Sequence, residues 1–218
     1  MSKPMRVLIF ICVLGLACSA GALISMMLNR QSTTTTEQSA SGVRDTGLRI
    51  LPFELIDHNG NAASEAELEG HWTVVDFIFT NCPGACPVMT ARMVEAAQRL
   101  EGKPVRFASF SIDERRDTPA RLREFADGYG IDLERWSFYT GDDEQTRRMV
   151  AEGLMLIVDE EADNEIAAHD GSTMKNIQHP TRLFLVSPEL KVVGLYSSGD
   201  PSELERLVSD LESVLSGE

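Results

Sequence analysis

The residues best suited to chemistry are two cysteines four positions apart, Cys82 and Cys86, in the segment NCPGACP. Thiolates are good ligands for soft metal ions, and a pair of thiols can also exchange with a disulfide bond. A disulfide here is a poor candidate for a stabilising cross-link, because so short a loop restricts the unfolded chain less than a long one does. The pair therefore indicates metal binding or redox chemistry.

Histidines are the candidates for a third ligand, because two thiolates alone form a low-coordinate site. His58 and His71 lie in turn-like sequences, where solvated loop histidines are expected. His169 follows the acidic run 159–165, which we expect to be a solvated loop rather than a site for a hard metal. His179 lies just before an apolar strand and so at the mouth of the sheet, a place where most histidines are still ordinary loop residues.

The cysteine pair lies between a strand and a helix. Residues 73–79 are apolar apart from Asp76, as in a central strand, and residues 88–100 carry apolar side chains at helical spacing. A helix N-terminus favours thiolate over thiol. If the pair occupies the first helical turn, its spacing of four brings both sulfurs to one face.

The rest of residues 47–218 alternates between strands and helices, and it ends in a hairpin followed by a helix. This order predicts a mixed α/β sheet flanked by helices. We expect further strands at 51–56, 105–112, 136–139, 154–158, 182–186 and 191–196, and further helices at 64–69, after the turn 117–119, from 142 and at 204–215.

The N-terminal segment, residues 7–28, contains no charged residue and is long enough to cross a membrane as a helix. Lys3 and Arg6 precede it, which predicts an N-terminus inside and an exported remainder. We interpret residues 1–30 as a retained transmembrane anchor. Two alternatives are a signal peptide cleaved after Ala22 and a lipid-modified Cys18.

Composition indicates how the chain is divided, which partners it can have and where it is located. The Ser- and Thr-rich residues 31–46 predict a flexible linker, and residues 47–218 a single folded domain. A formal charge of -14 excludes nucleic acid as a partner, because phosphate binding needs clustered Lys and Arg. No Arg-rich presequence precedes the anchor, so we expect a single-pass protein of the bacterial inner membrane with its domain in the periplasm.

Three segments resemble, in the same order, the Sco/SenC copper proteins: FIFTNCPGACPVMT, SFSIDERRDTPARLREFADGYG and IQHPTRLFLVSPELKVVGLYSS. The resemblance covers nearly all of residues 48–216. It implies a thioredoxin-like fold and one copper ion, Cu(I) or Cu(II), bound by Cys82, Cys86 and His179. It also implies assembly of the copper centre of cytochrome c oxidase, with the copper-centre subunit of that enzyme and another copper chaperone as partners.

The chain departs from the family pattern beside the histidine. Gln178 stands where the family usually has Asp, and Pro180 follows, which leaves open how the imidazole is oriented. Asp117 could support the site or could cap a helix, and Asp113 could also support it. Met174 is expected to be a packing residue rather than a ligand.

Two functions fit these residues. In a membrane-anchored copper chaperone His179 is essential, whereas in a thiol-disulfide oxidoreductase Cys82 and Cys86 form the redox-active pair and His179 is dispensable. Thioredoxin has two residues between its cysteines and this chain has three, which favours metal binding. A peroxidase or a purely structural domain would explain neither the second cysteine nor the late histidine.

Overall fold

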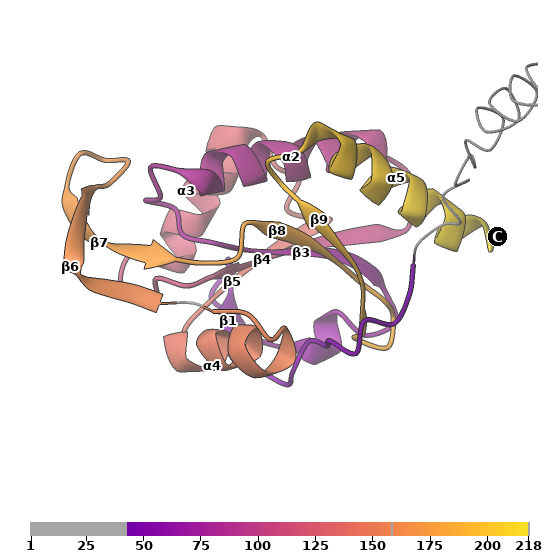
Figure 1. Cartoon of the computed structure of the whole chain (residues 1–218), viewed down its shortest axis with the longest axis horizontal. Coiled ribbons are helices and arrows are strands. Elements are labelled where there is room, and N and C mark those ends of the chain that lie inside the picture. Colours follow the sequence, from indigo (N-terminus) through magenta and orange to yellow (C-terminus); the bar gives the residue numbers. More distant parts are fainter. Residues whose placement is uncertain (1–42, 158, 218) are drawn as a thin grey trace, which may run out of the picture. The chain divides into compact units, whose positions relative to one another are not determined.

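The computed structural model describes residues 43–157 and 159–217 of the 218-residue chain (Figure 1). These residues fall within one compact unit, Ser41–Glu218. The expected anchor, residues 1–30, and most of the expected linker lie outside the described residues. Within the two described ranges, no helix combines the length and the apolar character that a membrane crossing requires.

A mixed seven-stranded sheet forms the centre of the domain, in the order β2-β1-β5-β4-β3-β8-β9. β3, β4 and β5 are parallel, and the strands on either side of these three are antiparallel to them. The predicted mixed sheet is thereby confirmed. The strands are β1 (Glu54–Asp57), β2 (Ala62–Ser64), β3 (Trp72–Ile78), β4 (Val105–Ser111), β5 (Trp136–Thr140), β8 (Arg182–Val186) and β9 (Val192–Ser197).

The helices form layers on both faces of this sheet. α2 (Ala85–Arg99) and α3 (Pro119–Tyr129) connect the parallel strands through two crossovers that step in the same direction. Because such crossovers are right-handed, both helices lie on one face. Figure 1 shows α5 (Pro201–Ser216) on that face too, with α4 (Asp143–Arg148) on the opposite one. A π-helical turn, Met149–Gly153, extends α4.

Capping residues fix where the helices begin. Pro119 opens α3, and the side chain of Thr118 accepts a hydrogen bond from a backbone N–H of its first turn. Asp200 caps α5 in the same way. α2 differs, because Gly84 at its cap position supplies no side-chain acceptor. The first backbone N–H groups of α2 therefore remain available to the cysteine loop.

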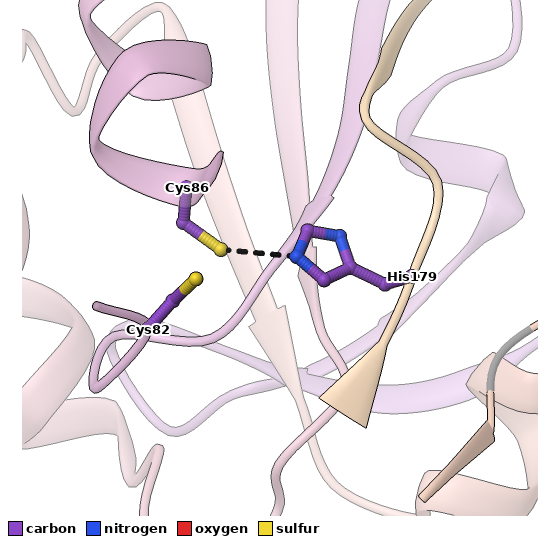
Figure 2. A group of neighbouring side chains, drawn as sticks. All are labelled: Cys82, Cys86 and His179. Atoms are coloured by element: carbon purple, nitrogen blue, oxygen red, sulfur yellow. Dashed lines mark hydrogen bonds between the residues drawn. The ribbon is translucent and has the colours of Figure 1, made fainter. Parts of the chain in front are cut away.

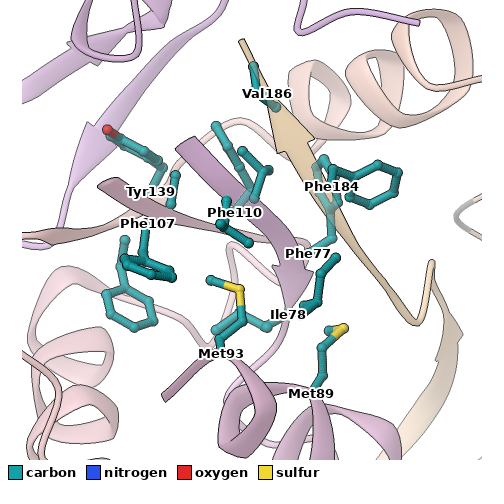
Figure 3. Close-up of a cluster of buried hydrophobic side chains, with 14 of the residues drawn as sticks. Phe77, Ile78, Met89, Met93, Phe107, Phe110, Tyr139, Phe184 and Val186 are labelled. Carbon is teal, nitrogen blue, oxygen red and sulfur yellow. The ribbon is translucent and has the colours of Figure 1, made fainter. Parts of the chain in front are cut away.

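Buried aromatic side chains from three strands pack against one another at the centre of the sheet (Figure 3). The ring of Phe77 lies 5.6 Å from that of Phe110 and 5.8 Å from that of Phe184. Met89 and Met93 of α2 are fully buried. Each such burial contributes about 1.5–3 kcal/mol, so the helix that carries Cys86 is firmly fixed to the sheet.

The predicted strand at 154–158 is wrong. The N–H groups of Leu154 and Leu156 donate to carbonyls of the preceding π-helical turn, so they close that helix instead of pairing with a strand. Met155 has a left-handed backbone conformation, with φ of 53°, which is incompatible with an extended strand.

The predicted acidic loop at 159–165 is also wrong. These residues belong to β6 (Asp159–Ala167), which pairs antiparallel with β7 (Thr173–Gln178) in a separate two-stranded sheet. A charge run opposes burial of side chains but leaves the backbone able to pair. The register shifts between Glu161 and Glu165, which marks the irregular centre of the strand. We call the two strands and their turn the β6–β7 hairpin.

The helix expected at 64–69 is a single 3₁₀ turn, η1 (Glu65–Glu67). Ser64 and Glu67 stand three residues apart, as in a capping box, but they do not form one, because Ser64 makes no side-chain cap bond. The carboxylate of Glu67 accepts a hydrogen bond from the hydroxyl of Tyr139 at 3.1 Å and so does not return to the helix start.

Candidate metal site

The structure brings Cys82, Cys86 and His179 together at the end of β3 (Figure 2). One ligand atom from each side chain lies within 4.8 Å of the other two. The Sγ atom of Cys86 lies 3.3 Å from Nε2 of His179. Cys82 and Cys86 are buried and His179 is half-buried, so the three donors form a cluster largely screened from water.

The two cysteines occupy different kinds of backbone. Cys86 lies in the first turn of α2, whereas Cys82 lies in the loop before it, where its N–H donates to the carbonyl of Phe79. The expectation that both belong to the first helical turn is therefore wrong for Cys82. Their sulfurs still converge, because the loop folds back over the open N-terminus of the helix.

Thr80, two residues before Cys82, ties this loop to the loop that follows β4. The buried carboxylate of Asp117 accepts hydrogen bonds from the Thr80 hydroxyl at 2.6 Å and from the Thr80 backbone N–H. It also accepts one from the hydroxyl of Ser111 at 2.7 Å. Asp117 thus supports the cysteine loop, and Thr118 is the residue that caps α3.

Asn81, directly before Cys82, binds the turn of the β6–β7 hairpin. Its backbone carbonyl accepts a hydrogen bond from the N–H of His169 at 3.0 Å. Its side-chain oxygen accepts one from the N–H of Asp170 at 3.1 Å. The hairpin that leads into His179 is therefore attached at its turn to the loop that carries Cys82.

The carbonyl of Pro180 orients the His179 ring. The residue before this histidine is Gln178, where the family usually has Asp. Nδ1 of His179 lies 3.1 Å from that carbonyl oxygen. Because a carbonyl only accepts, Nδ1 carries the proton and the lone pair of Nε2 faces Cys86. The ring also meets Phe79 edge to face, with centroids 5.5 Å apart.

The two thiols differ in acidity. The pKa of Cys82 is lowered to about 4, chiefly because the Cys86 thiol donates a hydrogen bond to its sulfur, and His179 and the backbone N–H groups of Cys86 and Gly84 lower it further. Burial, together with the adjacent Cys82 thiolate, raises the pKa of Cys86 well above its ordinary value. The reduced pair is therefore one thiolate and one thiol.

Asp76 lies in β3 and is completely buried. Among the described residues, none makes a hydrogen bond of good geometry to either carboxylate oxygen, although the hydroxyl of Ser109 lies close enough to favour the charged form slightly. Burial raises the pKa of Asp76 to about 7, against the opposing effects of Ser109 and His179.

The other candidate residues lie elsewhere or play other parts. The expectation of a solvated loop is wrong for His58, which is buried, with Nδ1 3.3 Å from the backbone N of Phe138. His71 is half-buried in a turn and His169 is exposed. Met174 is buried on β7, as expected of a packing residue.

Asp113 differs from Asp117 in that it does not reach the cysteine loop. Its carboxylate lies 2.9 Å from the guanidinium of Arg116 within the same turn.

Thr80 and Asn81 were not singled out by their sequence, although both hold the cysteine loop. Their partners lie far along the chain, and a short polar residue before a cysteine carries no local signal of such a contact. Asp76 had a signal that could have been followed further, since it is the single charged residue in an otherwise apolar strand segment.

The donor set suits a soft or borderline metal ion. Two sulfurs favour Cu(I), and an imidazole nitrogen is a good ligand for both oxidation states of copper. The three side chains could therefore form a metal site of this type.

The SCO1/SenC family profile matches residues 43–216, which is most of the chain, and the chain belongs to this family. It is 30% identical over 168 residues to the SCO1 protein homolog of Bacillus subtilis (strain 168), across 76% of this chain and 82% of that protein.

Solved structures share the fold. BsSco, described as a member of the Sco family of cytochrome c oxidase assembly proteins with a disulfide switch, matches at a TM-score of 0.65 and 30% identity, over 78% of this chain and 95% of that one. Copper-bound ScoI of Arabidopsis thaliana matches at 0.60 and 24% identity, over 75% and 98%. The fold is thus thioredoxin-like, as the resemblance implied.

Proposed function

We propose that this protein is a copper chaperone that holds one copper ion through Cys82, Cys86 and His179. The observation that carries the proposal is the convergence of two buried sulfurs and one half-buried imidazole nitrogen within 4.8 Å. Such a set suits Cu(I) through the thiolates and accommodates Cu(II) through the added nitrogen. Copper is here the cargo that the chaperone receives and passes on.

The recipient that we propose is the copper-centre subunit of cytochrome c oxidase, with another copper chaperone as the donor. Family membership supports this assignment, since BsSco is described as an oxidase assembly protein. We also propose that residues 1–30 anchor the protein in a bacterial inner membrane, with the folded domain in the periplasm.

Metal analysis of the full-length chain tests the copper site. Protein purified anaerobically and reduced should bind one Cu(I) per chain. His179→Ala should chiefly weaken binding of Cu(II), because the two sulfurs still hold Cu(I). His71→Ala is the matched control and should bind both oxidation states normally. A reduced chain that holds no copper would contradict the proposal.

A second candidate is a thiol-disulfide oxidoreductase, which the acidity of Cys82 favours. A thiolate with a pKa of about 4 beside a protonated thiol is typical of a nucleophile with its resolving partner. Cys82 would attack a substrate disulfide to form a mixed disulfide. Cys86 would then attack Sγ of Cys82, so that the substrate gains two electrons and leaves as a dithiol while Cys82 and Cys86 become a disulfide.

Reduction of oxidised glutathione separates the two candidates. An oxidoreductase should reduce it equally fast with and without His179, and it needs no copper. In cells that lack the gene, oxidase activity restored by added copper would indicate delivery. Restoration by added thiol reductant alone would indicate redox maintenance.

A further inference from the structure

Two cavities adjoin the cysteines, one beside the β6–β7 hairpin and one beside α3. The hairpin-side cavity, about 310 Å³, is lined by Cys82 and His179 and by apolar residues of the β6–β7 hairpin. The α3-side cavity, about 270 Å³, is lined by Cys82, Cys86 and His169 and by residues of α3 that include Arg121 and Tyr129. Among the described residues, His179 lines only the first cavity and Cys86 only the second. The two sulfurs thus share the α3 side with a different histidine.

His169 is held at this cavity by its backbone. Its N–H donates to the carbonyl of Asn81, the residue directly before Cys82. A second hydrogen bond, from the N–H of Asp170 to the Asn81 side chain, fixes the same turn. Within the turn, Ala168 and Gly171 are joined by a further backbone hydrogen bond of 2.9 Å. The position of His169 therefore follows that of the cysteine loop.

The α3-side cavity thus offers two sulfurs and one imidazole, which is the same donor set as the site with His179. Imidazole nitrogen is a suitable third ligand for copper held by two thiolates. Among the described residues, the ring of His179 lies within 4.8 Å of both sulfurs and that of His169 does not, so the His169 side chain must turn toward the sulfurs to bind the same ion. Exchange of one imidazole for another then requires no change in the sulfur ligands.

We propose that His169 is a second imidazole ligand for copper, used in place of His179 on the α3 side of the sulfur pair while the metal is loaded or released. This inference rests on the proposed copper-binding function. It assigns the α3-side cavity as the route of the metal, and Asn81 as the residue that positions the second histidine.

X-ray absorption of the copper-loaded, full-length chain tests the ligand assignment. The reduced chain is loaded with the acetonitrile complex of Cu(I), and scattering from imidazole ligands is counted. The wild-type chain and His179→Ala should each show one imidazole. The double variant His179→Ala/His169→Gln should show sulfur ligands only, whereas the control His179→Ala/His71→Gln should keep its imidazole.

Loading kinetics provide a second measurement with His179 in place. His169→Gln should slow uptake of Cu(I) from the acetonitrile complex by about tenfold, a size typical of disturbed metal-site contacts, while the equilibrium affinity stays within about twofold. His71→Gln should load at the wild-type rate. His169 is exposed, so its replacement is compatible with an intact fold, which circular dichroism checks.

The outcomes separate this inference from the proposed function. If the wild-type chain binds no copper, the proposed function itself fails. If the wild-type chain shows one imidazole and His179→Ala holds copper through sulfur alone, or loses copper, the second ligand is refuted. Wild-type loading rates in His169→Gln would likewise refute it.

Discussion

At the scale of single residues, Cys82 and Cys86 differ in acidity because each sulfur is the main neighbour of the other. The Cys86 thiol donates to the Cys82 sulfur and stabilises its negative charge, and that charge in turn opposes ionisation of Cys86. Ionisation of one sulfur therefore suppresses ionisation of the other. A metal ion that binds both sulfurs must displace the proton from Cys86.

Alkylation of the reduced chain by iodoacetamide tests this asymmetry. With a pKa of about 4, Cys82 should already be a thiolate in weak acid, so its rate should change little between about pH 6 and about pH 8. Cys86 should remain unmodified over this range. Mass spectrometry assigns the modified cysteine.

Cys86→Ala is the control for the cause of the shift. It removes the hydrogen bond that lowers the Cys82 pKa most, so the rate at Cys82 should become strongly pH-dependent. A wild-type rate that rises about tenfold per pH unit would mean that Cys82 is an ordinary thiol.

Asp76→Asn should stabilise the protein in neutral and alkaline solution. The folded-state pKa of Asp76, about 7, lies above its ordinary value of 3.8, so its contribution to stability is full below 3.8 and is lost as pH rises through 7. Asparagine does not ionise. The advantage of the variant in free energy of unfolding should therefore grow by about 3 kcal/mol between about pH 5 and about pH 8.

Denaturant unfolding at both pH values measures this difference. Asp127→Asn, at an exposed position of α3, is the matched control for the change from aspartate to asparagine. An advantage of Asp76→Asn that is the same at both pH values would show that the buried carboxyl titrates normally.

At the scale of elements, the cysteine loop is fixed by contacts to two other loops rather than by its own sequence. Thr80 binds Asp117 after β4, and Asn81 binds the turn of the β6–β7 hairpin. The loop after β4 and the turn of the hairpin are thereby attached to adjacent residues of the cysteine loop. Disturbing either contact should change the positions of the ligands without removing any of them.

Thr80→Val tests the first contact, because valine keeps the shape of threonine and removes its hydroxyl. The loss of the buried hydrogen bond to Asp117, and of the one that the hydroxyl accepts from Nε of Arg121, should lower the free energy of unfolding by about 1–3 kcal/mol. The affinity for Cu(I) should fall by about tenfold, the usual effect of losing support behind a ligand. Competition with bicinchoninate measures that affinity.

Thr118→Ala is the control for Thr80→Val. It removes the hydroxyl that caps α3 and should cost about 1 kcal/mol of stability, yet it should leave copper affinity unchanged. Equal affinities in the two variants would mean that the Thr80 contact serves only stability.

Elements with strong apolar patterns were predictable from the sequence. β3 and the start of α2 place Cys82 and Cys86 where the pattern of residues 73–79 and 88–100 indicated. Residues 154–158 have the composition of a strand, but their backbone closes a helix instead, which composition does not encode. The acidic run in β6 was misread because charge reports on burial and not on backbone pairing.

The proposed third ligand was not predictable from local pattern, because His179 lies 93 residues from Cys86 in sequence. Resemblance to a family suggested it, and the geometry brings its ring to the cysteines. The roles of Thr80 and Asn81 are still harder to predict from the sequence, since their hydrogen-bond partners are determined only by the complete fold.

At the scale of the whole molecule, negative charge dominates residues 31–218. The chain has 34 acidic residues against 20 Lys and Arg, and three of those bases belong to the N-terminal 30 residues. Such an excess attracts cations and repels anions on approach, so it acts on association rates more than on final affinity. The charge of a copper donor should therefore affect how fast this protein acquires copper.

Two small Cu(I) donors of opposite charge test this effect on the full-length chain. Loading from the cationic acetonitrile complex should slow as salt rises from about 0.01 M to about 0.1 M, because the Debye length falls from about 30 Å to about 10 Å and screens the attraction. Loading from the anionic bicinchoninate complex should accelerate over the same range. Stopped-flow absorbance follows both reactions. Opposite responses exclude a general salt effect on folding, whereas two rates that change in the same direction would show that the net charge does not govern the encounter.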